Sequence, residues 1–257
     1  MKKRAIFQVI ACLCAIMLLG MLNVAAAEDA DEHAEYALIY NGSVAAEEGP
    51  EAIAAIAERV GLPVQFVSDI AELPQLLDHA AIFIIGGTED DLTPLKNAFT
   101  PDITAALQTY LRGGGRYLGI CGGGYLASTG WHEGETFVEM LGLVPAESSD
   151  FDEDAGPQIL PISWLGETRP MYFQAGPAFE LTESSEAARV IASYADGQIA
   201  ALMSSYSEGK VAVCGPHPEA TESWSDEAEN GDAWTSTADL AVALLQELLS
   251  DRPVNAE

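Results

Sequence analysis

Basic residues are scarce in this sequence. Eleven Lys and Arg residues stand against 40 Asp and Glu residues, which gives a formal net charge of −29. After the first four residues, Lys96 and Lys210 are the only lysines. A surface this acidic repels phosphate backbones and anionic lipid headgroups. We therefore expect no nucleic acid partner, and no membrane association once any leader is removed. The sequence does not predict an oligomeric state.

Cysteines are also few. Cys12 and Cys14 lie in an apolar N-terminal run, which leaves Cys121 and Cys214 for the rest of the chain. Two thiols cannot form a disulfide scaffold, although a single pairing of Cys121 with Cys214 stays open. No His and Cys cluster has the spacing of a zinc site. We therefore expect no metal and no cofactor.

The N-terminus is typical of a secretory signal peptide. A basic start at residues 2–4 precedes a mostly apolar run, and Ala25-Ala26-Ala27 offers a cleavage site. We predict a signal peptide over 1–27, an acidic linker over 28–35 and a periplasmic or secreted protein. Two alternatives stay open. Cys12 ends a lipobox-like sequence, and the apolar run is nearly long enough for a membrane anchor.

The rest of the chain alternates strand and helix patterns. Apolar runs at 36–40, 64–67, 80–85 and 117–120 predict strands, and helical spacing at 50–60 and 101–112 predicts helices between them. This alternation favours an α/β fold with a mostly parallel central sheet flanked by helices.

Further strands at 158–163, 171–174, 190–194, 199–206 and 210–214 indicate hairpins. An acidic loop at 221–233 precedes a final helix at 234–249. We predict one domain over 36–250 and a tail over 251–257.

Cys121 stands in a sequence typical of a nucleophile elbow. The strand at 117–120 runs into Gly119-Ile120-Cys121-Gly122-Gly123, a G-x-nucleophile-x-G pattern with Cys in place of Ser. A helix starting after the Cys would direct its free N–H groups at the sulfur, which favours the thiolate. The Gly122 N–H would also face an oxyanion. The alternative is a buried Cys in a glycine-rich loop; no Lys-Ser/Thr follows, so a Walker loop is excluded.

His217 follows a second strand end, at Gly215-Pro216-His217-Pro218-Glu219. A neutral imidazole there would take the thiol proton, and Glu219 would fix its tautomer. The alternative is a loop histidine held between two prolines. His132, which follows Trp131 after the elbow, is a weaker candidate for lining the same pocket.

These segments together resemble the class I glutamine amidotransferase-like superfamily, specifically its biotin–protein ligase N-terminal-like group. The matching segments are residues 84–87, 113–128, 155–157, 172–177 and 215–219. The resemblance implies the flavodoxin-like fold of these amidotransferases, with Cys121 as nucleophile, His217 as base and Glu219 as its orienting acid. It also implies Gly87, Gly122 and Gly123 at the oxyanion and Tyr172, Gln174 and Gly176 at the substrate. Two departures stand out: Gly122-Gly123, where the family commonly has an Ala, and Gln174, where it commonly has Asn.

From this we expect a cysteine-dependent hydrolase that acts on a small-molecule or peptide amide, or a related acyl substrate, through a thioester. No biotin-ligase catalytic domain is attached, so ligase activity is not implied. The rival interpretation is a catalytically silent module that binds a small ligand or a protein. A redox or stress protein ranks last, because no acidic residue lies next to Cys121 in the sequence.

Overall fold

The computed structural model describes residues 35–89, 91–152, 156–182 and 187–255. The predicted signal peptide and nearly all of the acidic linker lie outside these residues. Contacts join the chain from Tyr36 onward into one unit. Within the described residues, no helix has both the length and the apolar character needed to cross a membrane.

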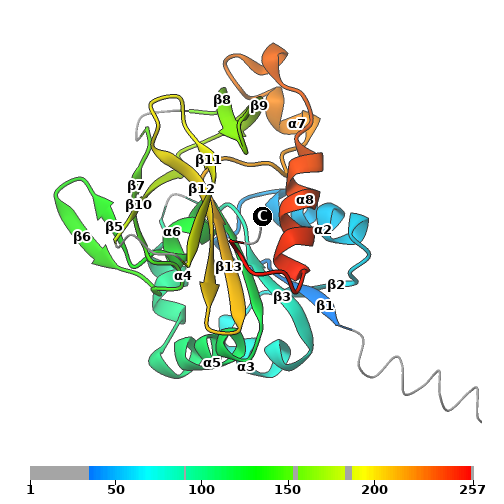
Figure 1. Ribbon diagram of the computed structural model, residues 1–257, viewed down its shortest axis with the longest axis vertical. Helices are drawn as coiled ribbons and strands as arrows, with labels where there is room; N and C mark the ends of the chain where they lie inside the picture. The colour runs from blue at the N-terminus through cyan, green and yellow to red at the C-terminus, as the bar shows by residue number, and fades with distance from the viewer. Residues whose placement is uncertain (1–34, 90, 153–155, 183–186, 256–257) are drawn as a thin grey trace, which may run out of the picture. The chain divides into compact units, whose positions relative to one another are not determined.

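A parallel sheet forms the centre of the fold, in the order β2-β1-β3-β4-β13 (Figure 1). Its strands are β1 (Tyr36–Tyr40), β2 (Val64–Val67), β3 (Ala80–Ile85), β4 (Arg116–Ile120) and β13 (Gly209–Cys214). All four pairings along this path are parallel. Their residues are almost continuously apolar, as expected for strands covered on both faces. The fold class predicted from the sequence is confirmed.

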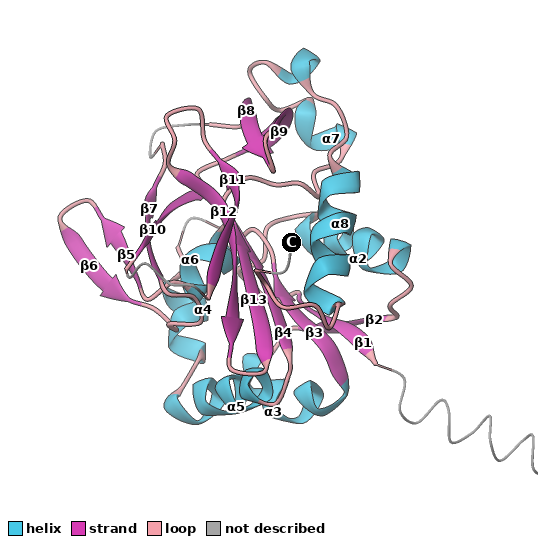
Figure 2. Ribbon diagram, in the orientation of Figure 1, coloured by secondary structure: helices cyan, strands magenta, loops and turns pink. Residues whose placement is uncertain are grey.

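Helices cover the two faces of this sheet (Figure 2). On one face α2 (Gly49–Arg59) packs against α8 (Ala238–Leu249), over alternate strand residues such as Ile39, Ile84 and Ile120. The other face buries Leu38, Phe83 and Tyr117 with residues of α3 (Leu73–Leu76) and α5 (Pro101–Arg112). The remaining helices are α4 (Thr93–Ala98), α6 (Gly122–Ala127) and α7 (Glu222–Ser225), with 3-10 turns at Ile70–Glu72, Leu77–His79 and Gly231–Ala233.

Antiparallel strands extend the sheet beyond β13. The path continues β12-β10-β7-β5-β6, and β11, β8 and β9 branch from β12. Their bounds are β5 (Gly130–Glu133), β6 (Thr136–Glu139), β7 (Ala146–Asp150), β8 (Gln158–Trp164), β9 (Glu167–Phe173), β10 (Pro177–Leu181), β11 (Ala188–Ser193) and β12 (Ile199–Tyr206). The two predicted hairpins, β11–β12 and β12–β13, are both present.

The parallel strands bring distant segments to one edge. Because β3, β4 and β13 are parallel neighbours, their carboxyl ends lie together. Gly86-Gly87 follows β3, Cys121 follows β4 and Gly215-Pro216-His217 follows β13. Ligand sites in open α/β sheets form at this edge.

Candidate active site

Cys121 lies on a strained turn between β4 and α6. Its backbone angles are φ 50° and ψ −110°, a region that residues with a side chain rarely adopt. The turn is held on both sides: the N–H of Cys121 donates to the carbonyl of Cys214 at 2.8 Å, and its carbonyl accepts from Gly124 at 2.8 Å. The strand–turn–helix predicted around this residue is therefore present.

Glycines allow this turn because the backbone passes close to its neighbours. A Cβ on Gly119 would lie 2.3 Å from the carbonyl oxygen of Gly123, and one on Gly123 would lie 2.1 Å from that of Ile85. A Cβ on Gly122 would meet the Thr88 side chain at 2.1 Å. Real side chains do not approach so closely, so strand and helix reach this separation only with glycine.

His217 is fixed by two partners. Its backbone N–H donates to the carbonyl of Tyr172 at 2.9 Å, which ties the loop after β13 to the end of β9. Its ring Nδ1 lies 2.9 Å from the carboxylate of Glu219. Both residues are buried, with exposed fractions of 4% and 3%. The second carboxylate oxygen of Glu219 is buried with no partner among the described residues.

Cys121 and His217 meet at this edge of the sheet. Both side chains line the same cleft, and Cys121 is one of the groups that raise the pKa of the His217 ring. The sulfur also lies 3.7 Å from the carbonyl oxygen of Gln174, to which the thiol can donate. The fold thus brings two residues that are almost a hundred positions apart in the sequence to one cleft.

Burial and charge act on His217 in opposite directions. Burial disfavours the protonated ring, but the Glu219 carboxylate and the hydrogen bond with Cys121 outweigh it and raise the pKa of His217 to about 10. The ring is therefore protonated at neutral pH. This differs from the neutral imidazole expected from the sequence, because the Glu219 carboxylate, 2.9 Å from Nδ1, favours the charged ring more than burial disfavours it.

A cleft of about 700 Å³ opens over the pair. Gly87 and Gly122 line it, and among the described residues neither backbone N–H has a hydrogen-bond partner. They are thus available to an oxygen bound beside the sulfur. Gly123 offers no such group, because its N–H donates to the carbonyl of Gly86 at 3.1 Å.

Tyr172 and Gln174 also line the cleft, and the Tyr172 hydroxyl donates to the Gln174 side-chain oxygen at 2.9 Å. Burial, and then the nearby Glu227 and Cys121, raise the pKa of Tyr172 to about 12. Gly176 does not line the cleft. A Cβ there would lie 2.2 Å from the carbonyl oxygen of Gly215, so its role is close backbone packing.

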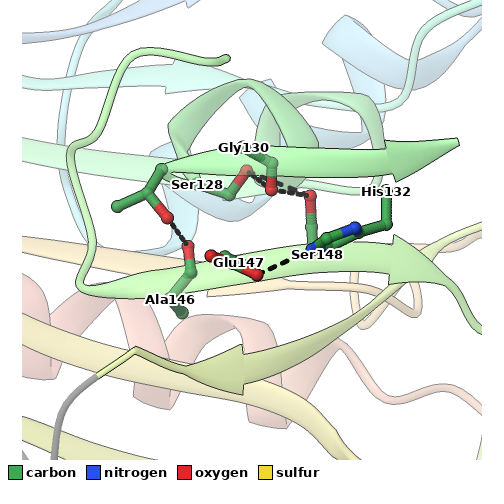
Figure 3. A network of polar contacts seen from close by, with 7 residues as sticks. Ser128, Gly130, His132, Ala146, Glu147 and Ser148 are labelled. Carbon is green, nitrogen blue, oxygen red and sulfur yellow. Dashed lines mark hydrogen bonds and ion pairs between the residues drawn. The ribbon is translucent and has the colours of Figure 1, made fainter. Parts of the chain in front are cut away.

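His132 lies elsewhere (Figure 3). Its ring is 2.7 Å from Glu147 on the neighbouring strand β7, in an exposed ion pair. Beside it, the buried hydroxyls of Ser128 and Ser148 lie 3.0 Å apart and hold β5 against β7. His132 is not among the described residues of the cleft wall, so the expectation that it lines the pocket is wrong.

Sequence reasoning missed much of the cleft wall. The further residues are Ala46, Glu47, Glu48, Thr88, Glu89, Leu92, Tyr125, Trp131, Asp150, Ala175, Ser223, Trp224 and Glu227. For two of these residues the sequence holds a feature that could have indicated the cleft. Thr88 follows Gly87 directly, and Trp224 is a large aromatic residue within an otherwise acidic loop.

The two cysteines are free thiols. Cys214 is fully buried and donates to the carbonyl of Pro216 at 3.1 Å. Burial, with Glu219 and Cys121 nearby, raises its pKa well above the ordinary value. Among the described residues, no group of His, Cys, Asp and Glu side chains could hold a metal ion.

The fold is similar to that of solved glutamine amidotransferases. A glutamine amidotransferase from Thermotoga maritima superposes with a TM-score of 0.56 at 13% identity, over 87% of this chain and 100% of that one. A second glutamine amidotransferase gives a TM-score of 0.54 at 16% identity, over 71% of this chain and 90% of that one. A cytoplasmic protein from Salmonella typhimurium gives a TM-score of 0.51 at 15% identity, over 83% of this chain and 98% of that one.

Residues 37–143 match the family described as the N-terminal region of biotin–protein ligase, the group that the motifs resemble. That match covers β1 to the elbow helix and the segment that follows it. No curated protein matches the chain in sequence.

Proposed function

We propose that this chain is an exported cysteine hydrolase that cleaves an amide or related acyl substrate through a thioester. Cys121 is the nucleophile, His217 the general acid and base, and Glu219 the group that orients the ring. The observation that carries the proposal is that Cys121, on its strained turn, and His217, held by Glu219, line one cleft. Export is supported by the N-terminal sequence, which is typical of a signal peptide.

In the first half of the reaction, the Cys121 thiolate attacks the carbonyl carbon and a C–S bond forms. The carbonyl oxygen becomes an oxyanion, and the N–H groups of Gly87 and Gly122 donate to it. When the C–N bond breaks, His217 gives its proton to the leaving amine, and a thioester remains on Cys121. The raised pKa of His217 suits this step, because the proton is already on the ring at neutral pH.

In the second half, the amine leaves and water enters beside the ring. His217, now neutral, takes a proton from the water as its oxygen attacks the thioester carbon. The C–S bond breaks, the carboxylic acid leaves and Cys121 returns as thiolate beside the protonated ring. Glu219 holds Nδ1 in both halves, which leaves the other ring nitrogen to exchange the proton.

The rate of Cys121 alkylation by iodoacetamide near neutral pH tests this proposal. We expect fast alkylation in the wild type and at least tenfold slower alkylation in His217→Ala, because the protonated ring stabilises the thiolate. Cys121→Ser gives the background from other thiols. Slow alkylation that does not change in His217→Ala would reject the hydrolase and favour a silent binding module on the same fold.

A further inference from the structure

The cleft over Cys121 has a one-sided charge. Five carboxylates line it: Glu47, Glu48, Glu89, Asp150 and Glu227. None of the described residues of its wall is Lys or Arg, and its one basic side chain, His217, is already paired with Glu219. A cleft lined by charges of one sign concentrates the field and attracts ligands of the opposite charge.

Two of these carboxylates are held in place. The Tyr125 hydroxyl donates to Asp150 at 2.6 Å, deep in the wall beside the elbow helix. The Ser223 hydroxyl donates to Glu48 at 3.0 Å, which joins α7 to the start of α2. These hydrogen bonds keep negative charge on both sides of the cleft without neutralising it.

Aromatic rings stand between the carboxylates. Trp224 packs edge-on against Tyr172 and against His217, with ring centroids 5.4 Å apart in both pairs. Tyr125 and Trp131 form a second pair at 5.3 Å on the opposite wall. Aromatic faces attract ammonium and guanidinium groups, most strongly where carboxylates stand beside them.

We propose that this cleft selects substrates in which the scissile carbonyl lies close to a positive charge, such as an amide that carries an ammonium or guanidinium group. The cleft volume of about 700 Å³ fits a small molecule or a short basic peptide. An anionic amide would meet five carboxylates and no partner. That the bound molecule is cleaved rests on the proposed function. That it carries a positive charge does not.

Charged thiol reagents test this selection on the full chain. Trimethylammonioethyl and sulfonatoethyl methanethiosulfonate carry opposite charges and react alike: the thiolate attacks the thiosulfonate sulfur, a mixed disulfide forms and methanesulfinate leaves. The rate of each reagent with the wild type is corrected by its rate with Cys121→Ser, which gives the rate at Cys121. The cation-to-anion ratio of these rates is then divided by the ratio that the two reagents give with 2-mercaptoethanol. We expect a normalised ratio of about tenfold or more at low salt, falling as salt is added.

Paired variants separate the cleft from the general negative charge of the protein. Glu89→Gln/Glu227→Gln removes two charges from the cleft, and we expect it to lower the ratio several-fold. Glu51→Gln/Glu58→Gln removes two exposed charges from α2 outside the cleft and should lower it less than twofold. A normalised ratio near one, or an equal loss in both double variants, would overturn the proposal.

The same experiment distinguishes the two proposals. If Cys121 reacts slowly and does not respond to His217→Ala, the hydrolase is rejected. A high charge ratio that follows Glu89 and Glu227 would still support the cationic ligand, which would then be bound and not cleaved.

Discussion

At the scale of single residues, the protonation of His217 contributes both to stability and to the chemistry. A ring whose pKa is raised on folding stabilises the folded state fully below its unfolded pKa, about 6.5. That contribution is lost as the pH rises through the folded value of about 10. Between about pH 6.5 and about 10, the stabilisation from this ring therefore declines as the pH rises.

Glu219→Gln tests this pairing. The amide keeps the shape of the side chain and an acceptor for Nδ1 but removes the charge, so the pKa of His217 should fall. We expect the wild type to be more stable than the variant below about pH 6.5 and the difference to shrink as the pH rises towards 10. Urea unfolding at a series of pH values measures it. His217→Gln, which has no titrating ring, is the control, and parallel curves for wild type and Glu219→Gln would contradict the account.

The residues of the candidate site that sequence predicted are those with a fixed relation to a strand end. Cys121 and His217 each follow a parallel strand, and the topology brings such positions together. Trp224 and Asp150 could not be placed in this way, because they reach the cleft through α7 and the antiparallel extension. Gly176 was misplaced because a glycine needed for close packing and one beside a substrate look alike in sequence.

At the scale of elements, the elbow depends on the close passage of β4 and α6. Gly119 lies in the strand and Gly123 in the helix, and no side chain fits between them. The thiol position therefore depends on backbone packing as much as on the strained angles of Cys121 itself.

Gly119→Ala should separate strand from helix. The added methyl group would meet the Gly123 carbonyl at 2.3 Å, and we expect a loss of about 1–3 kcal/mol in the free energy of unfolding together with slower Cys121 alkylation. Gly156→Ala is the matched control, because no atom lies within 4 Å of its Cβ position. Equal stabilities for the two variants, measured by urea unfolding, would show that the elbow tolerates the extra volume.

Elements with strong apolar patterns were predicted well, and polar strands were not. The structure reproduces the predicted bounds of β1, β2, β3, β12 and α5. By contrast, β6 and β7 have the sequences TFVE and AESSD, which carry little apolar periodicity. They form because neighbouring strands supply hydrogen bonds, and local sequence does not report that. The acidic loop at 221–233 contains the short helix α7, which its sequence did not indicate.

At the scale of the whole molecule, the scarce cations gather on one helix. Of the eight Lys and Arg residues that follow Arg4, four contact α8 or the residue after it. Arg116 and Lys210 donate to backbone carbonyls at its C-terminus, and Arg169 and Arg189 pair with Asp239 and Glu247. Cations at a helix C-terminus offset the negative end of its dipole.

The remaining charge is largely uncompensated, and it should oppose folding. With a formal net charge of −29, like charges lie closer together in the folded chain than in the unfolded one. We expect the melting temperature to rise as sodium chloride is added from low ionic strength, because salt screens this repulsion. The salt is sodium chloride and not a sulfate, because sulfate also stabilises proteins by exclusion from their surface and would obscure the screening effect. A melting temperature that stays constant or falls would contradict this.

The most direct test of the account is the mass of the intact protein during reaction with an activated ester that carries an ammonium group. We predict a transient gain of one acyl group on Cys121, lost again by hydrolysis in the wild type, long-lived in His217→Ala and absent in Cys121→Ser. Acylation that appears equally in Cys121→Ser, or wild-type protein that never gains the acyl group, would contradict the claim that Cys121 and His217 form a working pair.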